Sequence, residues 1–293
     1  HLLSSAASDV YKRQIIIPPS IPMIVYAVMS QSSVVQLFVA GIIPGVIGGF
    51  FLMLAAYVTA RKKNFPVEET FNIPNVKKTA KDAALAFLLP VIILGGIFGG
   101  VVTATEGAGL AVVASLVIGF IYKEIDFKRL YESACEGAIQ TASVMLLVAA
   151  SVLLGEFLTI EQIPQKVAES IIEFTNNKYA VLGILNIFLL IIGFFLHSVA
   201  AIILTVPIVM PLVNAVGIDP VHFGIIVTLN LAIGQQTPPV ASVLVTACSV
   251  AKADIWDVTR SNISFICVLL VLLLLVTYVP AIPMTLVEYF YRS

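Results

Sequence analysis

The segment GQQTPPVASVLVTACSVAKADIWDVTRSNIS, residues 234–264, repeats the pattern of IIIPPSIPMIVYAVMSQSSVVQLFVAGIIPG, residues 15–45. In both segments a Pro-Pro pair begins a short apolar arm, a polar patch follows, and a long apolar run comes next. Pro18-Pro19 aligns with Pro238-Pro239. A helical arm of about 12 residues rises about 18 Å, which is too short for a hydrocarbon core about 30 Å thick. Each Pro-Pro pair therefore predicts either the tip of a re-entrant hairpin or the break in one helix.

The two Pro-Pro pairs also predict a place where ions bind. Proline has no amide hydrogen and leaves helix carbonyls unpaired, and a dehydrated cation is a suitable partner for them inside a membrane. The hydroxyls of Ser20 and Thr237 are oxygen ligands of the kind that hard cations take. The helix after each pair directs its positive end toward the same place, which suits an anionic substrate. The alternative is that the prolines only kink helices for packing, but a repeated motif beside hydroxyl side chains favours the site.

The composition indicates that lipid surrounds much of the chain. Of 293 residues, 59% are hydrophobic and 11% are charged, and the mean hydropathy is +1.04, whereas soluble domains carry about 25% charged residues. An ordinary cytosolic enzyme is therefore excluded, and a net charge of −1 leaves no basic face for nucleic acid. We expect crossings of about 20 residues at these places: Leu37–Ala60, Ala83–Val102, Gly107–Tyr122, Ala134–Leu154, Tyr179–Leu196, Ala200–Val216 and Asn262–Ile282. The run Val221–Gly234 is too short to cross alone.

Basic residues orient the first of these crossings. Lysines and arginines cluster between Arg61 and Lys81, and a second cluster of Lys123, Lys128 and Arg129 follows two crossings later. The positive-inside rule places both clusters on the cytoplasmic side. The segment Glu161–Lys178 lies one crossing further on, and its helical apolar spacing predicts an amphipathic helix on the outer interface. The apolar residues of that helix are Ile163, Val167, Ile171 and Ile172.

Two acidic residues at segment boundaries need an interpretation. Glu106 follows an apolar segment that is broken by glycines, and an acid inside the membrane is a functional candidate by default. The alternative is a charge at the N-terminus of the helix Gly107–Tyr122, where the helix dipole favours it. Both interpretations stay open. Asp219-Pro220 predicts a turn and an N-cap before the short arm that begins at Val221.

Four stretches carry a resemblance to a known family: PPSIPMIVY (18–26), LFVAGIIPG (37–45), LLPVIILGGIFGGVVTATEGAGLAV (88–112) and GIDPVHFGIIVTLNLAIGQQTPPV (217–240). They resemble the DctM-like large permease subunit of TRAP (tripartite ATP-independent periplasmic) transporters. The resemblance extends over residues 15–293. It implies an all-α polytopic membrane protein, an elevator-type transporter with inverted repeats and re-entrant helical hairpins, one complete and one partial.

The resemblance also implies a function. The family consists of secondary transporters in bacterial or archaeal cytoplasmic (inner) membranes, which import organic acid anions of the C4-dicarboxylate, 2-oxoacid or sugar-acid type with sodium as the coupling ion. A periplasmic substrate-binding protein and a small four-helix membrane subunit are the implied partners. Two alternatives are a non-transporting channel or structural subunit and an intramembrane enzyme. An enzyme would need a zinc-binding His pair or an activated serine, whereas His1, His197 and His222 are scattered.

The site residues follow from matching the family motif to this sequence. Pro18–Ser20 would close the first hairpin and Thr237–Pro239 the second. Sodium is implied at each tip together with the helix break that follows it, at Pro18, Ser20, Ser30, Ser32, Ser33, Gly234, Thr237, Thr246 and Ser249. The substrate anion is implied at Ser20, Asn230, Thr237, Pro238 and Pro239. His197 stands where the family often has an acidic residue, and TATEGA (103–108) stands where it often reads TPTEAA.

The first fourteen residues, HLLSSAASDVYKRQ, differ from the rest. They lack the order of a signal peptide, in which a basic start precedes an apolar run. The string SSAASDVYKRQ resembles translated sequencing-adapter read-through. We therefore expect residues 1–14 to be a non-native artefact and residues 15–293 to be a partial permease domain without the inward arm of the first hairpin.

Overall fold

Helices joined by turns make up the chain wherever the computed structural model describes it, which is over residues 17–62, 73–123, 125–175, 177–238, 244, 248 and 255–291. No strand occurs in these ranges. Six of the helices are long and apolar enough to cross a membrane, or seven if the bent helix α4 counts as one span. Helices suit lipid because they satisfy their own backbone hydrogen bonds. The all-α polytopic membrane fold expected from the sequence is thereby confirmed.

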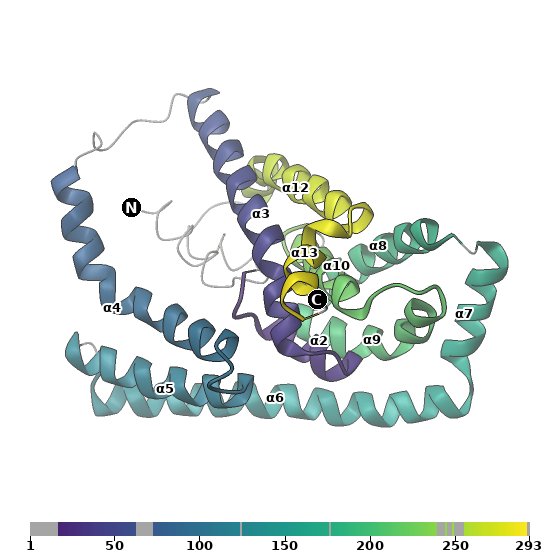
Figure 1. Ribbon diagram of the computed structural model, residues 1–293, viewed down its shortest axis with the longest axis horizontal. Coiled ribbons are helices and arrows are strands. Elements are labelled where there is room, and N and C mark those ends of the chain that lie inside the picture. The colour runs from purple at the N-terminus through teal and green to yellow at the C-terminus, as the bar shows by residue number, and fades with distance from the viewer. Residues whose placement is uncertain are drawn as a thin grey trace. The chain divides into compact units, whose positions relative to one another are not determined.

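The helices fall into two compact units (Figure 1). Unit 2 is Thr59–Ser143, and unit 1 is formed by the described residues of His1–Val58 and Val144–Ser293. Unit 1 holds α2 (Ile21–Ser30), most of α3 (Val34–Lys62), α7 (Ile163–Phe174), α8 (Lys178–Phe195), α9 (Ser198–Ala215), α10 (Pro220–Gly234), α12 (Ile255–Tyr278) and α13 (Ala281–Tyr291). Unit 2 holds α4 (Ile73–Phe98), α5 (Ala104–Ile121) and the first part of α6 (Phe127–Ile160).

Helix α10 is the centre of unit 1. It packs against α2, α8, α9, α12 and α13 (Figure 1), and every residue from Val221 to Gly234 is buried. Its 15 residues rise only about 22 Å, less than the thickness of a hydrocarbon core. The prediction of a short apolar arm that cannot cross alone is confirmed.

Side chains from the neighbouring elements fix the start of α10. The Oδ1 atom of Asp219 accepts hydrogen bonds from the backbone N–H groups of Val221 at 2.8 Å and His222 at 3.2 Å, which confirms the predicted N-cap. The hydroxyl of Tyr26 in α2 donates to the carbonyl of Pro220 at 2.7 Å. A Cβ atom at Gly224 would lie 2.5 Å from the Leu37 side chain and 2.6 Å from the Tyr26 ring. Glycine therefore lets α2 and α3 approach α10 closely.

Unit 2 begins with two helices that pack together, α4 and α5. Helix α4 bends by 53° between Ile73–Lys81 and Ala83–Phe98 (Figure 1). In unit 1, the helix α9 contains two prolines in its interior, Pro207 and Pro211. Breaks and prolines of this kind are tolerated in membrane helices when neighbours or local adjustments satisfy the freed backbone groups.

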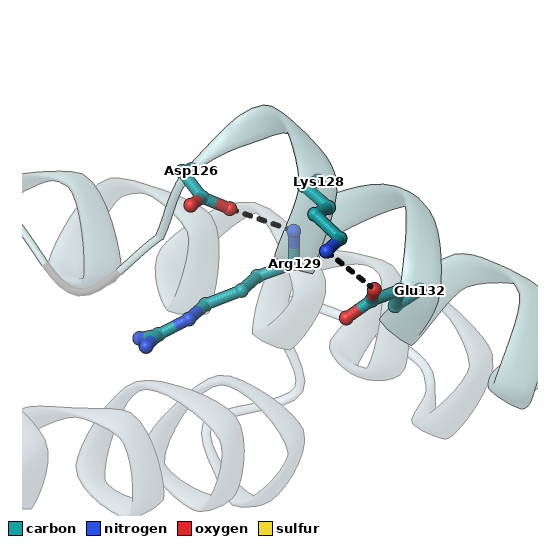
Figure 2. A network of polar contacts seen from close by, with 4 residues as sticks. All are labelled: Asp126, Lys128, Arg129 and Glu132. Carbon is teal, nitrogen blue, oxygen red and sulfur yellow. Dashed lines mark hydrogen bonds and ion pairs between the residues drawn. The ribbon is translucent and has the colours of Figure 1, made fainter.

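Charged side chains gather at the start of α6 (Figure 2). The Oδ1 atom of Asp126 accepts from the backbone N–H of Arg129 at 2.7 Å, in the manner of an N-cap. The Nζ atom of Lys128 lies 4.0 Å from Oε1 of Glu132, and both side chains are exposed. Solvated ion pairs of this type contribute little to stability. Lys128 and Arg129 belong to the second basic cluster, whose cytoplasmic placement stays a prediction.

Two of the expected crossings end earlier than predicted. The crossing expected over Ala83–Val102 stops at Phe98, because Gly100 adopts a left-handed φ of +68° and begins a turn. The crossing expected over Asn262–Ile282 stops at Tyr278, and a separate helix begins at Ala281. Pro280 lies between the two helices, and proline cannot donate the hydrogen bond that would continue α12.

The predicted amphipathic helix forms as α7, Ile163–Phe174. It packs against α9, with Pro164 and Ala168 buried and Ile163 half-buried. Val167, expected on the apolar face, is 41% exposed. Helical spacing thus predicted the element, and its place on the outer interface stays a prediction.

Candidate functional site

The first Pro-Pro pair immediately precedes α2. Its peptide bond Pro18-Pro19 is cis, and Ser20 is the N-cap of α2 with extended backbone angles. The side chain of Ser20 makes no capping hydrogen bond to the helix, although the residue is only 1% exposed. Ser20 takes part in a further interaction in the structure, so the residue is not without a partner. The first predicted tip is therefore a buried helix start.

The polar patch after this arm is a real break between helices. Helix α2 ends at Ser30, and Gln31 adopts a left-handed φ of 55°. The hydroxyl of Ser30 donates to the Tyr26 carbonyl at 2.7 Å and lies 2.9 Å from the hydroxyl of Ser32. The backbone N–H of Gln36 donates to Oγ of Ser33 at 3.4 Å, which caps α3. The three predicted serines thus lie at one helix break.

The second Pro-Pro pair follows α10. Helix α10 ends at Gly234, and residues 235–238 form turns. The hydroxyl of Thr237 donates to the Ile233 carbonyl at 2.9 Å, and this carbonyl also accepts from the backbone N–H of Gln236 at 3.1 Å. Pro238 is half-buried. Three further predicted residues, Pro239, Thr246 and Ser249, lie outside the described residues.

Gly234 has a packing role that sequence reasoning did not identify. A Cβ atom there would lie 2.5 Å from the backbone carbon of Gly193 in α8 and 2.6 Å from its Cα. Real Cβ atoms do not approach backbone this closely. The two glycines therefore bring α8 and α10 into backbone contact, as small residues do in membrane bundles.

Asn230 lies in a chain of buried polar side chains on three helices. Its Nδ2 atom donates to Oδ1 of Asn186 in α8 at 2.7 Å, and Nδ2 of Asn186 donates to Oγ1 of Thr277 in α12 at 3.0 Å. The exposed fractions are 0% for Asn230, 6% for Asn186 and 0% for Thr277. We call these three residues the amide relay. Buried networks of this kind hold their helices in one register.

Among the residues that the structure describes, two side-chain atoms near the end of α10 are buried without a hydrogen-bond partner. They are Oδ1 of Asn230, which accepts, and Nε2 of Gln235, which donates. Gln235 is the residue immediately after α10 and is 2% exposed. An unpaired buried polar atom costs about 1–3 kcal/mol, so each of these atoms marks a place where a ligand would gain a hydrogen bond or a coordination bond.

Three of these residues escaped the sequence analysis: Asn186, Gln235 and Thr277. Asn186 is an amide within the apolar run of α8, and a polar residue inside a membrane helix is itself a signal of function. Thr277 and Gln235 give no such signal, because threonine is common in membrane helices and Gln235 adjoins another glutamine. Only the packing of α8, α10 and α12 shows that Asn186 and Thr277 meet.

Glu106 forms a capping box with Thr103 at the start of α5. Its Oε2 atom accepts from the backbone N–H of Thr103 at 2.8 Å and from the Thr103 hydroxyl at 2.9 Å. In return, Oγ1 of Thr103 accepts from the backbone N–H of Glu106 at 3.3 Å. The structure therefore shows the helix N-terminal charge, one of the two interpretations of Glu106. A role as an intramembrane acid stays a prediction.

The described residues form a multi-pass helical membrane protein with a buried polar centre around a short broken helix. The family model for the tripartite ATP-independent periplasmic transporter, DctM component, matches residues 6–282. The chain belongs to this family, the large permease subunits of TRAP transporters.

Similar proteins support this assignment. The chain is 41% identical over 272 residues to the isethionate TRAP transporter permease protein DctMQ of Oleidesulfovibrio alaskensis. The aligned residues make up 92% of this chain and 43% of that protein. It is 37% identical over 273 residues to the C4-dicarboxylate TRAP transporter large permease protein DctM of Pseudomonas aeruginosa, covering 93% and 64%. It is 35% identical over 276 residues to the sialic acid TRAP transporter large permease protein SiaM of Vibrio cholerae, covering 94% and 65%.

The chain thus spans less than two thirds of the length of these relatives. All three relatives are named as transporter permeases. The protein is accordingly a transporter-family member and not an enzyme, and the alternative of an intramembrane enzyme is dropped.

Proposed function

We propose that this chain is part of the permease of a sodium-coupled secondary transporter that imports organic acid anions. In this proposal a periplasmic binding protein delivers the anion, a small four-helix subunit completes the membrane complex, and the complex lies in a bacterial or archaeal cytoplasmic membrane. The substrate classes are those in the names of the relatives, which include C4-dicarboxylate, sialic acid and 2,3-diketo-L-gulonate. Membership in the TRAP family supports each of these points.

One observation carries the proposal beyond family membership. Helix α10 is apolar, too short to cross and buried from Val221 to Gly234, and it is followed by turns over residues 235–238 that end at the first proline of the second Pro-Pro pair. A simple channel wall or a structural anchor gains nothing from burying a broken helix with unpaired polar atoms. A transporter does, because interrupted helices in its two halves place backbone and side-chain polar groups at the binding site.

The two unpaired atoms of this region have opposite hydrogen-bonding character. Nε2 of Gln235 is a donor and suits a carboxylate oxygen of the substrate, whereas Oδ1 of Asn230 is an acceptor. The hydroxyl of Thr237, two residues after Gln235, is the nearby oxygen ligand for sodium. Thr237 already bonds to the Ile233 carbonyl, so a cation held there would share both oxygens. This arrangement supports the placement of anion and cation close together at the second tip.

The test is uptake by the full-length permease that contains this sequence, reconstituted with its small subunit and its binding protein. Radiolabelled C4-dicarboxylates, 2-oxoacids and sugar acids are offered with and without an inward sodium gradient. We expect saturable uptake of one of these classes that requires both the gradient and the binding protein. Uptake that ignores sodium would refute the coupling, and the absence of uptake from an assembled complex would favour a channel or structural subunit.

A matched pair of threonine variants tests the tip itself. Thr237→Ala removes the tip hydroxyl, and we expect the sodium concentration for half-maximal uptake to rise while the unfolding temperature stays near that of the wild type. Thr141→Ala in α6 is the control, because the Thr141 hydroxyl makes the same type of bond, to the Gly137 carbonyl at 2.8 Å, at an exposed position. An equal change in both variants would show that Thr237 has no special part in sodium binding.

A further inference from the structure

The amide relay ends in a buried oxygen atom, Oδ1 of Asn230 on the central helix of unit 1, that is available to a ligand. Asn230 has two amide hydrogens and both are used, one on Oδ1 of Asn186 at 2.7 Å and one on the Ile226 carbonyl of its own helix at 2.8 Å. The remaining polar atom of the side chain, Oδ1, is buried and has no hydrogen-bond partner within the described part of the chain. Asn230 can therefore offer a ligand an acceptor and no donor.

The orientation of this amide is fixed by its neighbours. The Ile226 carbonyl can only accept, so turning the Asn230 amide by 180° would place two oxygen atoms against each other. Asn186 must then direct its own Oδ1 toward Asn230 and its Nδ2 toward the opposite side. There Oγ1 of Thr277 accepts the hydrogen bond from Nδ2 of Asn186 at 3.0 Å. Thr277 is thus the outer end of the relay, 91 residues from Asn186 in the sequence. A hydrogen-bonded amide chain of this kind also polarises its terminal carbonyl oxygen.

An acceptor without a donor discriminates between the two ligands of the proposed function. A carboxylate of the substrate offers only oxygen atoms, and it would be repelled by Oδ1 of Asn230. A sodium ion, in contrast, takes amide oxygens as ligands, and the surrounding α10 residues are buried, which leaves the oxygen without competing water. We propose that Asn230 is a ligand of the coupling cation, not of the anion, and that Asn186 and Thr277 are positioning residues that hold its oxygen in place.

This inference rests on the proposed sodium coupling and changes one assignment within it. The family resemblance made Asn230, on the entering arm of the second hairpin, a candidate for sodium as well as a substrate-binding residue, whereas the hydrogen-bond pattern assigns it to the cation. The inference also gives a function to Asn186 and Thr277, which touch neither ligand. Loss of the Thr277 hydroxyl would leave Nδ2 of Asn186 buried and unpaired, and the Asn186 side chain would no longer be held toward Asn230.

The experiment measures sodium binding apart from transport. The full-length permease is purified in detergent, and its unfolding temperature is followed against NaCl, with KCl at equal ionic strength as the reference. Ligand binding to the folded state raises this temperature. For Thr277→Val, which keeps the shape and removes the hydroxyl, we expect the sodium concentration at the midpoint to rise about three- to tenfold, the worth of one buried hydrogen bond. Thr277→Ser restores the hydroxyl and should stay within about twofold of the wild type.

A buried threonine outside the relay provides the control. Thr228 is 0% exposed and lies on α10 itself, and its hydroxyl bonds only to carbonyls of its own helix, those of Gly224 and Ile225. Thr228→Val should lower the unfolding temperature without moving the sodium midpoint. In uptake assays at saturating sodium, Thr277→Val should leave the KM for the anion within about twofold, since the relay does not touch the anion.

The outcomes separate the relay from the proposed function. If the wild type is stabilised by NaCl but Thr277→Val keeps the same midpoint, or if Thr228→Val shifts it equally, the relay has only a structural role. If Thr277→Val raises the KM for the anion instead, Asn230 belongs to the substrate after all. If sodium does not stabilise the wild type and uptake ignores it, the sodium coupling fails, and the relay has no cation to hold.

Discussion

Helices α5 and α10 are both short of charge and rich in aliphatic residues, yet they occupy opposite environments. In α10 every residue from Val221 to Gly234 is buried against other helices. In α5, over Ala104–Ile121, only Gly107 and Ile118 are buried, and Phe120 is 51% exposed. Hydropathy marks both as membrane segments, but it does not tell which one faces protein and which one leaves its side chains outside.

The difference has a physical consequence for substitutions. Between helices in lipid the hydrophobic effect gives little driving force, because lipid tails are as apolar as leucine. What distinguishes a buried position is therefore close packing and hydrogen bonding, which a neighbouring helix provides and a lipid does not. Equivalent substitutions in α10 and in α5 or α6 should then differ most where packing is tightest.

The largest difference is expected for glycine. Gly234→Ala in α10 places a Cβ atom 2.5 Å from the Gly193 backbone, and we expect a loss of more than about 3 kcal/mol, the upper range for overpacked sites. Gly109→Ala in α5 has no atom within 4 Å of its Cβ, and it should stabilise its helix by about 0.5–1 kcal/mol. Thermal unfolding of the two purified variants gives the comparison. Similar unfolding temperatures would mean that α8 and α10 do not cross at these glycines.

Phenylalanine gives the next largest difference. Phe223 in α10 is 0% exposed and packs edge-on against Tyr26 with ring centroids 6.4 Å apart. Phe223→Ala should cost about 3 kcal/mol, the lower end of the range for a buried phenylalanine, through the cavity that it leaves. Phe120→Ala in α5 removes a half-exposed ring and should cost less than about 1 kcal/mol, because lipid or detergent fills the space. A greater loss in Phe120→Ala, measured as unfolding temperature, would mean that α5 is covered by another protein segment.

A hydrogen bond should give a smaller difference. Nε2 of His222 lies 2.8 Å from the Val276 carbonyl, which has no partner from its own helix because residue 280 is proline and lacks an N–H. His222→Leu leaves that carbonyl unpaired and should cost about 1–2 kcal/mol. Gln140→Leu in α6 removes an exposed contact of 3.4 Å to Glu136 and should cost less than about 0.5 kcal/mol. Equal losses would contradict the buried carbonyl bond.

The same contrast explains what the sequence could predict. Crossings need about 20 apolar residues, so α3, α5, α8 and α9 were predicted within a few residues, whereas α6 extends beyond the expected Ala134–Leu154 at both ends, to Phe127 and Ile160. Local chemistry gave the Asp219 cap, and the family resemblance gave the helix break at Ser30–Ser33. The ends at Phe98 and Tyr278 were predicted too late, because apolar composition continues past the turn at Gly100 and past Pro280.

The candidate site was predictable only in part. Asn230 and Thr237 were named from a motif, and their backbone context follows from the end of α10. The partners of Asn230 were not predictable, since Asn186 lies 44 residues before it and is separated from Thr277 by 91. Such pairings depend on which helix faces touch, and a hydropathy pattern does not contain that information.

The smallest expected effect concerns the cap of α5, and it separates the two interpretations of Glu106. Thr103→Ala removes the N-cap hydroxyl and should cost about 1 kcal/mol, while Thr105→Ala, exposed in the same turn, should change the unfolding temperature little. Glu106→Gln keeps an acceptor for the Thr103 N–H, because glutamine also completes a capping box, so its unfolding temperature should stay near the wild type. If Glu106 acts only as a cap, sodium-driven uptake persists in Glu106→Gln. If uptake is lost while the unfolding temperature holds, the carboxylate itself takes part in transport.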